Sequence, residues 1–186
     1  FKSGGALDES TLRKLVKRQI AAGIHFLVPC GTTGESPTLS PDEHLRVVEI
    51  TVAEAKGKVP VVAGAGGYNT AEVAHLAQAV EALGADGILS VTPYYNRPTQ
   101  EGLFQHYRAV AKATRLPILV YSVQGRTGVN VEAATLARLA GIRNIVGVKE
   151  ASGNIGQIAK VIHECPAGFA VLSGDDALTI PLMALG

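Results

Sequence analysis

Residues 144–150 read NIVGVKE, a short apolar run that ends in a lysine and a glutamate. Five similar runs recur along the chain, and by subtraction the six starts lie 35, 27, 30, 27 and 25 residues apart. Each interval leaves room for one helix, so the pattern predicts repeated βα units and a parallel sheet. The other five runs begin near His25, Pro60, Gly87, Pro117 and Phe169.

Helix start signals fall between these runs. Residues 40–43 (SPDE) combine a Ser N-cap, a Pro at the first helical position and a Glu two positions later, which predicts a capping box. Residues 69–72 (NTAE) predict a second capping box. A first helix is expected over about residues 8–22. Further candidate N-caps are Thr99, Asn130 and Asn154.

The chain reads as a single domain over residues 1–186, because no linker or change of composition divides it. Six parallel strands can form an open sheet or six-eighths of a (β/α)8 barrel. The domain looks incomplete at both ends, since it opens in a helix with no strand before it and stops just past a helix that follows the sixth run. Two unpaired sheet edges are then expected.

Composition narrows the function classes. The chain has 186 residues, 47% of them hydrophobic, with a mean hydropathy of +0.22 and a net charge of +1 from 17 basic and 16 acidic residues. No basic run suggests nucleic-acid binding, and no apolar stretch reaches the roughly 18–20 residues that span a membrane. Neither Cys30 and Cys165 nor the five histidines follow metal-ligand spacing. We expect no metal site and a reduced, cytoplasmic protein.

The polar and glycine-rich segments directly follow the apolar runs. Side chains at the carboxyl ends of parallel strands form the active sites of barrels and the ligand crevices of open α/β sheets. The functional site is therefore predicted on this face in either fold. These segments span residues 31–35, 64–67, 92–96, 121–128, 149–153 and 173–176.

Lys149 stands out because strand alternation places it on one face with Ile145 and Gly147. A structural lysine paired with a carboxylate is one interpretation. The other is a nucleophile: a free lysine has a pKa of about 10.4, burial lowers the pKa of an amine, and the neutral amine attacks ketones to form a Schiff base.

Other side chains in these segments also have two interpretations. Tyr121 is either a core tyrosine or a general acid/base, and Arg126 either ties down its loop or binds a substrate carboxylate. Thr32 and Thr33 are turn formers or, between two glycines, an oxyanion or carboxylate site. The tyrosine pair 94–95 suits a subunit interface or a binding site.

Taken together, the segments GTTGES (31–36), TPYYNRP (92–98), YSVQGRTG (121–128), VGVKEASGN (146–154) and SGDD (173–176) resemble one known family. It is the dihydrodipicolinate synthase family of pyruvate-dependent class I aldolases, which includes N-acetylneuraminate lyase. The resemblance runs along essentially the whole chain in the same order. It implies a (β/α)8 barrel assembled as a homotetramer, acting as a Schiff-base-forming lyase.

The resemblance also implies the reaction and its residues. Pyruvate would condense with Lys149, and the resulting enamine would add to aspartate semialdehyde on the route to diaminopimelate and lysine, without a metal or organic cofactor. Tyr121 would exchange protons beside the Schiff base, and Thr32 would connect it to Tyr95 from a neighbouring subunit. Thr33 would hold the pyruvate carboxylate, and Arg126 that of the semialdehyde.

An effector site for lysine is also implied between subunits. Ser36, His44, Glu72 and Tyr94 match its residues in lysine-responsive relatives, whereas Pro41 replaces a histidine and Tyr68 an asparagine. Weak or no inhibition by lysine is therefore expected.

The chain departs from the family pattern elsewhere too. The loop after Tyr121 reads Ser122-Val123-Gln124 where Asn-Val-Pro is common, which predicts weaker positioning of Arg126. The resemblance further implies a strand before Phe1 and more chain after Gly186, so we expect a piece of a longer enzyme that is inactive in isolation.

Two other functions stay open on these residues. A related aldolase acting on 2-keto-3-deoxy sugar acids or N-acetylneuraminate would share Lys149 and differ in its acceptor. A non-catalytic barrel that binds a small acid is the third hypothesis, although it would not require Lys149, Tyr121, Thr32 and Tyr95 together.

Overall fold

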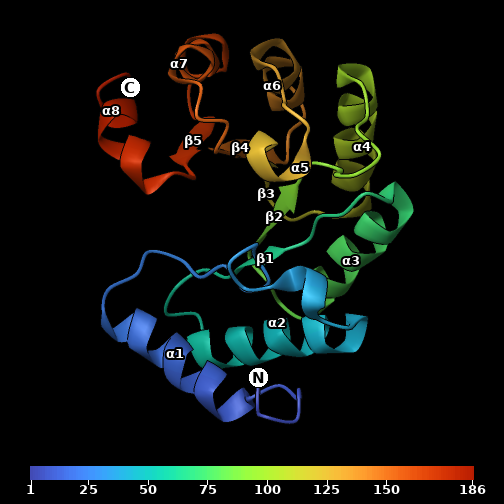
Figure 1. The fold of residues 1–186 in the computed structure, drawn as a ribbon, viewed down its shortest axis with the longest axis vertical. Helices are drawn as coiled ribbons and strands as arrows, with labels where there is room; N and C mark the ends of the chain where they lie inside the picture. The colour runs from blue at the N-terminus through green and yellow to red at the C-terminus, as the bar shows by residue number, and fades with distance from the viewer.

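The computed structural model describes residues 1–186, which form an α/β fold around a five-stranded parallel sheet. The strands pair in sequence order, β1-β2-β3-β4-β5, so each crossover returns to the neighbouring position. Figure 1 shows the helices in an arc around the strands, with α1 and α8 near its two ends. The strands are β1 (Val62–Gly64), β2 (Gly87–Val91), β3 (Ile118–Ser122), β4 (Ile145–Glu150) and β5 (Ala170–Ser173).

The run near His25 is not a regular strand, so the prediction of six strands was wrong by one. Only an isolated bridge joins Leu27 to Val61. The segment still runs parallel to β1, because Leu27 N–H donates to Pro60 O at 2.9 Å and Gly64 N–H donates to Pro29 O at 2.8 Å. The left-handed backbone at Cys30 (φ 56°) then breaks the extended geometry that a longer ladder needs.

Helices occupy the intervals between the apolar runs, as the spacing predicted. The longer ones are α1 (Glu9–Ala21), α2 (Pro41–Ala55), α3 (Thr70–Ala82), α4 (Gln100–Ala113), α6 (Ala133–Ala140) and α7 (Ile155–Glu164). The short ones are η1 (Ser36–Thr38), α5 (Gln124–Thr127), η2 (Asp176–Leu178) and α8 (Thr179–Met183). Every helix is too short or too polar to cross a membrane.

Most predicted caps are confirmed. Ser40 and Glu43 form the capping box of α2, and the side chains of Thr99 and Asn154 cap α4 and α7. Asn69 caps α3, but Glu72 accepts from the Asn69 side chain rather than its backbone, so no second capping box forms.

The prediction that Asn130 caps a helix was wrong. The N-cap of α6 is Glu132, which makes no side-chain capping bond. The Asn130 side chain instead exchanges two hydrogen bonds with the Gln157 amide, at 2.7 and 3.1 Å. A long-range amide pair therefore replaced the local cap.

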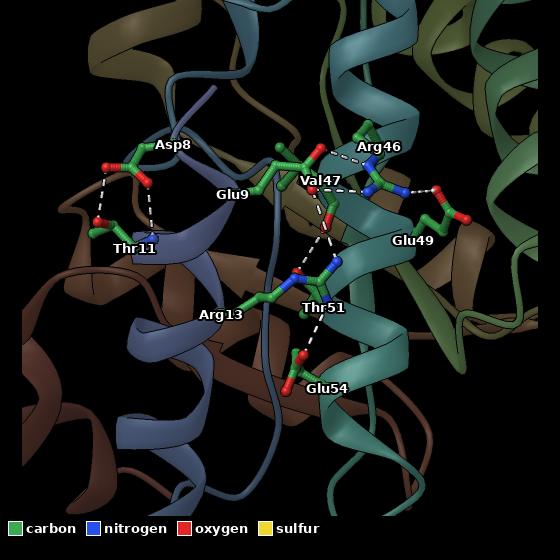
Figure 2. A network of polar contacts seen from close by, with 9 residues as sticks. All are labelled: Asp8, Glu9, Thr11, Arg13, Arg46, Val47, Glu49, Thr51 and Glu54. Atoms are coloured by element: carbon green, nitrogen blue, oxygen red, sulfur yellow. Dashed lines mark hydrogen bonds and ion pairs between the residues drawn. The ribbon is translucent and has the colours of Figure 1, made fainter. Parts of the chain in front are cut away.

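Ion pairs lock α1 against α2, as Figure 2 shows. Arg46 donates to both oxygens of Glu9, at 2.8 and 2.7 Å, and also to Glu49 at 2.8 Å. Arg13 reaches Glu54 on α2 at 2.8 Å. Most of these side chains are solvent-accessible and Glu54 is half-buried, so each exposed pair contributes little stability, but together the pairs define how the two helices align.

The two faces of the sheet carry different side chains. The main core of 23 buried residues lies between the sheet and the helices and includes Ile88, Val120 and Val148. A smaller cluster of Leu89, Tyr121 and Val123 is separate from it. In register, Val91, Tyr121, Lys149 and Leu172 form one row across β2–β5 on the face opposite the main core. This row crosses the sheet at the carboxyl ends of the strands, which is where the functional site is predicted.

Candidate active site

Lys149 and Tyr121 meet at the carboxyl edge of the sheet. They are direct register partners on β4 and β3, and the Lys149 Nζ lies 4.2 Å from the centroid of the Tyr121 ring. Tyr121 is buried, so its ring forms a fixed wall beside the amine. A cation over an aromatic face is attracted by the ring quadrupole, which holds the amine over Tyr121.

Lys149 also faces the threonine loop, which is residues 31–35 with Thr32 and Thr33, across a cavity of about 400 Å³. Thr32, Thr33 and Lys149 all line this cavity, together with apolar side chains such as Leu89 and Leu119. Lys149 is partly exposed rather than buried, because its amine ends in this open space. The expected burial of the amine was therefore too strong, whereas the two threonines line the same cavity as the amine.

Close backbone packing holds the threonine loop against β1. A Cβ atom at Gly64 would lie 2.0 Å from Cys30 O, so only glycine permits this approach. Cys30 and Glu35 both have left-handed backbones, with φ of 56° and 55°. Strained residues of this kind persist where the surrounding packing enforces them, often at functional sites.

Gly174 is a site residue that the sequence reasoning did not single out. A Cβ atom there would lie 2.8 Å from Ala151 Cβ and 3.1 Å from Lys149 Cε. The absence of a side chain therefore leaves the room that the lysine stem occupies. The available signal was a glycine directly after the last apolar run.

Thr32 lies at the junction of three cavities. Besides the lysine cavity, it lines a small space of about 30 Å³ with Tyr121 and a larger one of about 950 Å³ with Tyr95. The structure brings Thr32 beside Tyr121 but contains no hydrogen bond between their hydroxyls. The proton relay through Thr32 thus stays a prediction.

Tyr95 and Arg126 do not reach the lysine cavity within one chain. Tyr95 is 93% exposed and has a left-handed backbone with φ of 69°. Arg126 lies in α5, a one-turn helix where the sequence suggested only a loop, and it is exposed. Both line the 950 Å³ cavity, which opens beside Thr32.

The residues expected at an effector site divide between neighbouring cavities. Ser36 and Tyr94 line the 950 Å³ cavity, whereas Ser36 and His44 line the 30 Å³ cavity. His44 Nε2 lies 2.8 Å from Gly64 O, and burial lowers the pKa of this histidine, so the neutral ring donates that bond. Glu72 accepts from Asn69 at the start of α3.

Tyr68 packs against Tyr94 beside this region. Their ring centroids lie 5.4 Å apart at 81°, an edge-to-face pair. Burial, together with nearby Tyr68 and Glu72, raises the pKa of Tyr94, which therefore stays protonated at neutral pH. Tyr68 thus occupies space next to Tyr94 that a smaller polar residue would leave open.

Glu150, the neighbour of Lys149, is a second feature that sequence reasoning did not anticipate. Its side chain is on the opposite face of β4 and is 1% exposed. Its Oε1 accepts from Ser152 N–H at 2.8 Å, while its Oε2 has no hydrogen-bond partner. Burial raises the pKa of this carboxyl, against the opposing effect of its hydrogen bond from Ser152.

Comparisons with known proteins identify the family of this chain. The model of the dihydrodipicolinate synthetase family matches residues 1–186. The 4-hydroxy-tetrahydrodipicolinate synthase of Syntrophus aciditrophicus is 54% identical over 186 residues, which are 100% of this chain and 64% of that relative. The chain thus spans less than two thirds of the relative's length.

Solved structures share the fold. Dihydrodipicolinate synthase from Aquifex aeolicus superimposes with a TM-score of 0.97 at 43% identity, covering 100% of this chain and 64% of that one. A monomeric dihydrodipicolinate synthase variant gives a TM-score of 0.97 at 45% identity, covering 100% of this chain and 63% of that one. The chain belongs to the dihydrodipicolinate synthetase family.

Proposed function

We propose that this chain carries the active-site lysine of a 4-hydroxy-tetrahydrodipicolinate synthase, which condenses pyruvate with aspartate semialdehyde. The observation that carries the proposal is the convergence of Lys149, Tyr121, Thr32 and Thr33 at one edge of the sheet. A partly exposed amine, a buried phenol and two hydroxyls in such an arrangement suit covalent capture of a small keto acid. Family membership and the 54% identical relative of that name support the same activity.

In this mechanism the neutral Lys149 amine attacks the keto carbon of pyruvate. The carbinolamine loses water to give a protonated Schiff base, and Tyr121 would exchange the protons of these steps, a role that the position of its ring beside the amine supports. Loss of a methyl proton gives an enamine whose carbon adds to the aldehyde of the semialdehyde. Thr33 would hold the pyruvate carboxylate throughout. The product, still an iminium at Lys149, leaves when its own amine displaces the lysine.

The proposal includes the rest of the expected assembly. The consecutive strand order and the arc of outer helices favour a (β/α)8 barrel, in which this chain supplies a single domain over residues 1–186. We further propose a homotetramer in the cytoplasm, with Tyr95 reaching the site of a neighbouring subunit. The exposure of Tyr95 within one chain supports that role.

Borohydride trapping tests the proposed function. The full-length protein is incubated with pyruvate, reduced and digested, and peptide masses are mapped. We expect one pyruvate-derived adduct on Lys149, no adduct in Lys149→Ala, and an unchanged adduct when the exposed Lys160 is replaced by Ala. An adduct on another lysine, or none, would contradict the proposal and favour a non-catalytic acid-binding barrel.

The acceptor is tested separately. Turnover with aspartate semialdehyde is compared with turnover of sugar aldehydes and with cleavage of N-acetylneuraminate. Faster reaction with the sugar substrates would assign the chain to a related aldolase instead. We also expect Arg126→Ala to reduce use of the semialdehyde while leaving pyruvate trapping intact.

Inhibition by lysine is expected to be weak or absent. Tyr68 packs edge-on against Tyr94, beside the cavity that Ser36 lines, and occupies space in the region where relatives would accept an effector. Initial rates are measured across a lysine titration, and Tyr68→Asn serves as the variant that reopens this space. Clear inhibition of the unmodified protein at submillimolar lysine would refute this expectation.

A further inference from the structure

The 950 Å³ cavity beside the lysine site is lined by two arginines, Arg97 and Arg126. None of its lining residues is acidic, and neither arginine forms an ion pair. Arg97 was not given a role by the sequence motifs. A concave surface with two unpaired guanidinium groups and no carboxylate of its own is suited to an anion.

The backbone directs Arg97 toward the loop that carries Arg126. Arg97 has a left-handed backbone with φ of 44°, which is unfavourable for a residue with a long side chain. Asn96 stabilises this turn, because its side chain donates to Tyr68 O at 3.1 Å and its N–H donates to Tyr94 O at 2.8 Å. The turn that carries Arg97 is thus held by one local hydrogen bond and by one to the segment before α3.

The Arg97 guanidinium lies directly against Gly128, two residues after Arg126. A Cβ atom at Gly128 would be 3.0 Å from Arg97 Nε and 3.2 Å from Arg97 Nη2. Gly128 itself has φ of 70° and ends α5. The Arg97 guanidinium therefore lies against the loop that carries Arg126, both arginines line one cavity, and a side chain at Gly128 would push Arg97 away.

We propose that Arg97 is a second carboxylate-binding residue of the acceptor subsite and selects aldehydes that bear a carboxylate. This inference rests on the proposed function and extends it, because there Arg126 alone holds that group. Two planar forks around one carboxylate fix its orientation more strictly than one fork does. Uncharged aldehydes of the same length lack the group that satisfies both cations and are disfavoured.

The test compares Arg97→Gln, which removes the charge, with Arg97→Lys, which keeps it but loses the fork. Arg143→Gln is the matched control, since Arg143 is also exposed and forms no ion pair. In the full-length protein, kcat and KM are measured for aspartate semialdehyde and for butanal, and pyruvate trapping at Lys149 is measured in parallel. Thermal unfolding checks that each variant is folded.

We expect Arg97→Gln to raise KM for the semialdehyde about tenfold and to lower the preference for it over butanal by a similar factor. Arg97→Lys should raise KM for the semialdehyde less than Arg97→Gln does. Its KM should increase with ionic strength, as that of the unmodified protein does. Arg143→Gln should change neither value. Pyruvate trapping should be equal in all four proteins.

An unchanged KM for the semialdehyde in Arg97→Gln would overturn the inference. A loss of pyruvate trapping in Arg97→Gln as large as its loss of semialdehyde turnover would also overturn the inference. Arg97 would then support the structure of its loop rather than bind the acceptor. If the unmodified protein does not trap pyruvate on Lys149, the proposed function itself fails, and this outcome is distinct from a failure of Arg97 alone.

Discussion

At the scale of single residues, the Lys149 amine depends on what its neighbours leave empty. Gly174 lies where a methyl group would contact both Ala151 and the Lys149 stem. The phenol ring of Tyr121 bounds the amine at 4.2 Å on another side. The position of Lys149 therefore depends on the absence of a side chain at Gly174 as well as on the Tyr121 ring. In close-packed surroundings, one added methyl group is enough to displace a neighbouring side chain.

Gly174→Ala is expected to slow formation of the pyruvate adduct by about tenfold, because the new methyl displaces Lys149 Cε. The rate is measured by borohydride trapping over time. Gly156→Ala is the control, since its Cβ would meet only Asn154 Oδ1 at 3.5 Å. An unchanged rate in Gly174→Ala, with normal thermal unfolding, would mean that the lysine tolerates a shift.

At the scale of elements, α4 is attached to the sheet and to α3 through two adjacent side chains. Tyr107 donates its hydroxyl hydrogen to Ser90 O at 3.0 Å, and His106 Nδ1 lies 2.9 Å from Thr70 Oγ1. His106 Nε2 is buried without a partner. Burial lowers the pKa of His106 to about 4 from its ordinary value of 6.5. The His106 ring is therefore neutral in the folded protein at neutral pH.

This shift predicts a pH dependence of stability. A lowered folded-state pKa means that the unfolded chain binds the proton more tightly, so stability is fully present above 6.5 and is lost as pH falls toward 4. From pH 7.5 to 5, His106 should account for a loss of about 2 kcal/mol in the free energy of unfolding.

Urea unfolding at both pH values measures this loss, and His106→Asn should show a correspondingly smaller decrease. The exposed His75 on α3, replaced by Asn, serves as the control and should keep the full decrease. Equal losses in the unmodified protein and His106→Asn would show that other groups dominate acid unfolding.

At the scale of the whole molecule, Tyr95 lies apart from the lysine cavity of its own chain. Tyr95 protrudes with 93% of its surface exposed and lines the cavity of Arg126 rather than that of Lys149. A large aromatic side chain on a strained, exposed turn is typical of an interface residue. Its role in a neighbouring site stays a prediction.

Mixing two inactive variants of the full-length protein tests that role. Lys149→Ala subunits retain Tyr95, and Tyr95→Phe subunits retain Lys149, so a shared interface combines both intact residues in one site. We expect each variant alone to have little activity and re-assembled mixtures to recover a measurable fraction. No recovery in mixtures shown to contain hybrid oligomers would place Tyr95 outside the neighbouring site.

The order of helices and strands was predictable because it depends on local patterns. Apolar runs, capping residues and their spacing anticipated β1–β5 and the N-termini of α2, α3, α4 and α7. The predictions of a strand near His25 and of a cap at Asn130 were wrong because factors other than the local pattern decided the structure there. A left-handed residue at Cys30 and a distant amide on Gln157 overruled the local signal there.

The sequence by itself determined the alternation of βα units, and it predicted a site at the carboxyl edge of the sheet with Lys149, Tyr121, Thr32 and Thr33 as candidate residues. Only the tertiary structure decided that Lys149 is partly exposed over Tyr121, that Gly174 makes room for it and that Arg97 lies against Gly128. The physical reason is that periodicity and capping act between neighbours in the chain. Clearance, burial and the convergence of loops depend on atoms that are far apart in sequence and touch only after the sheet has formed.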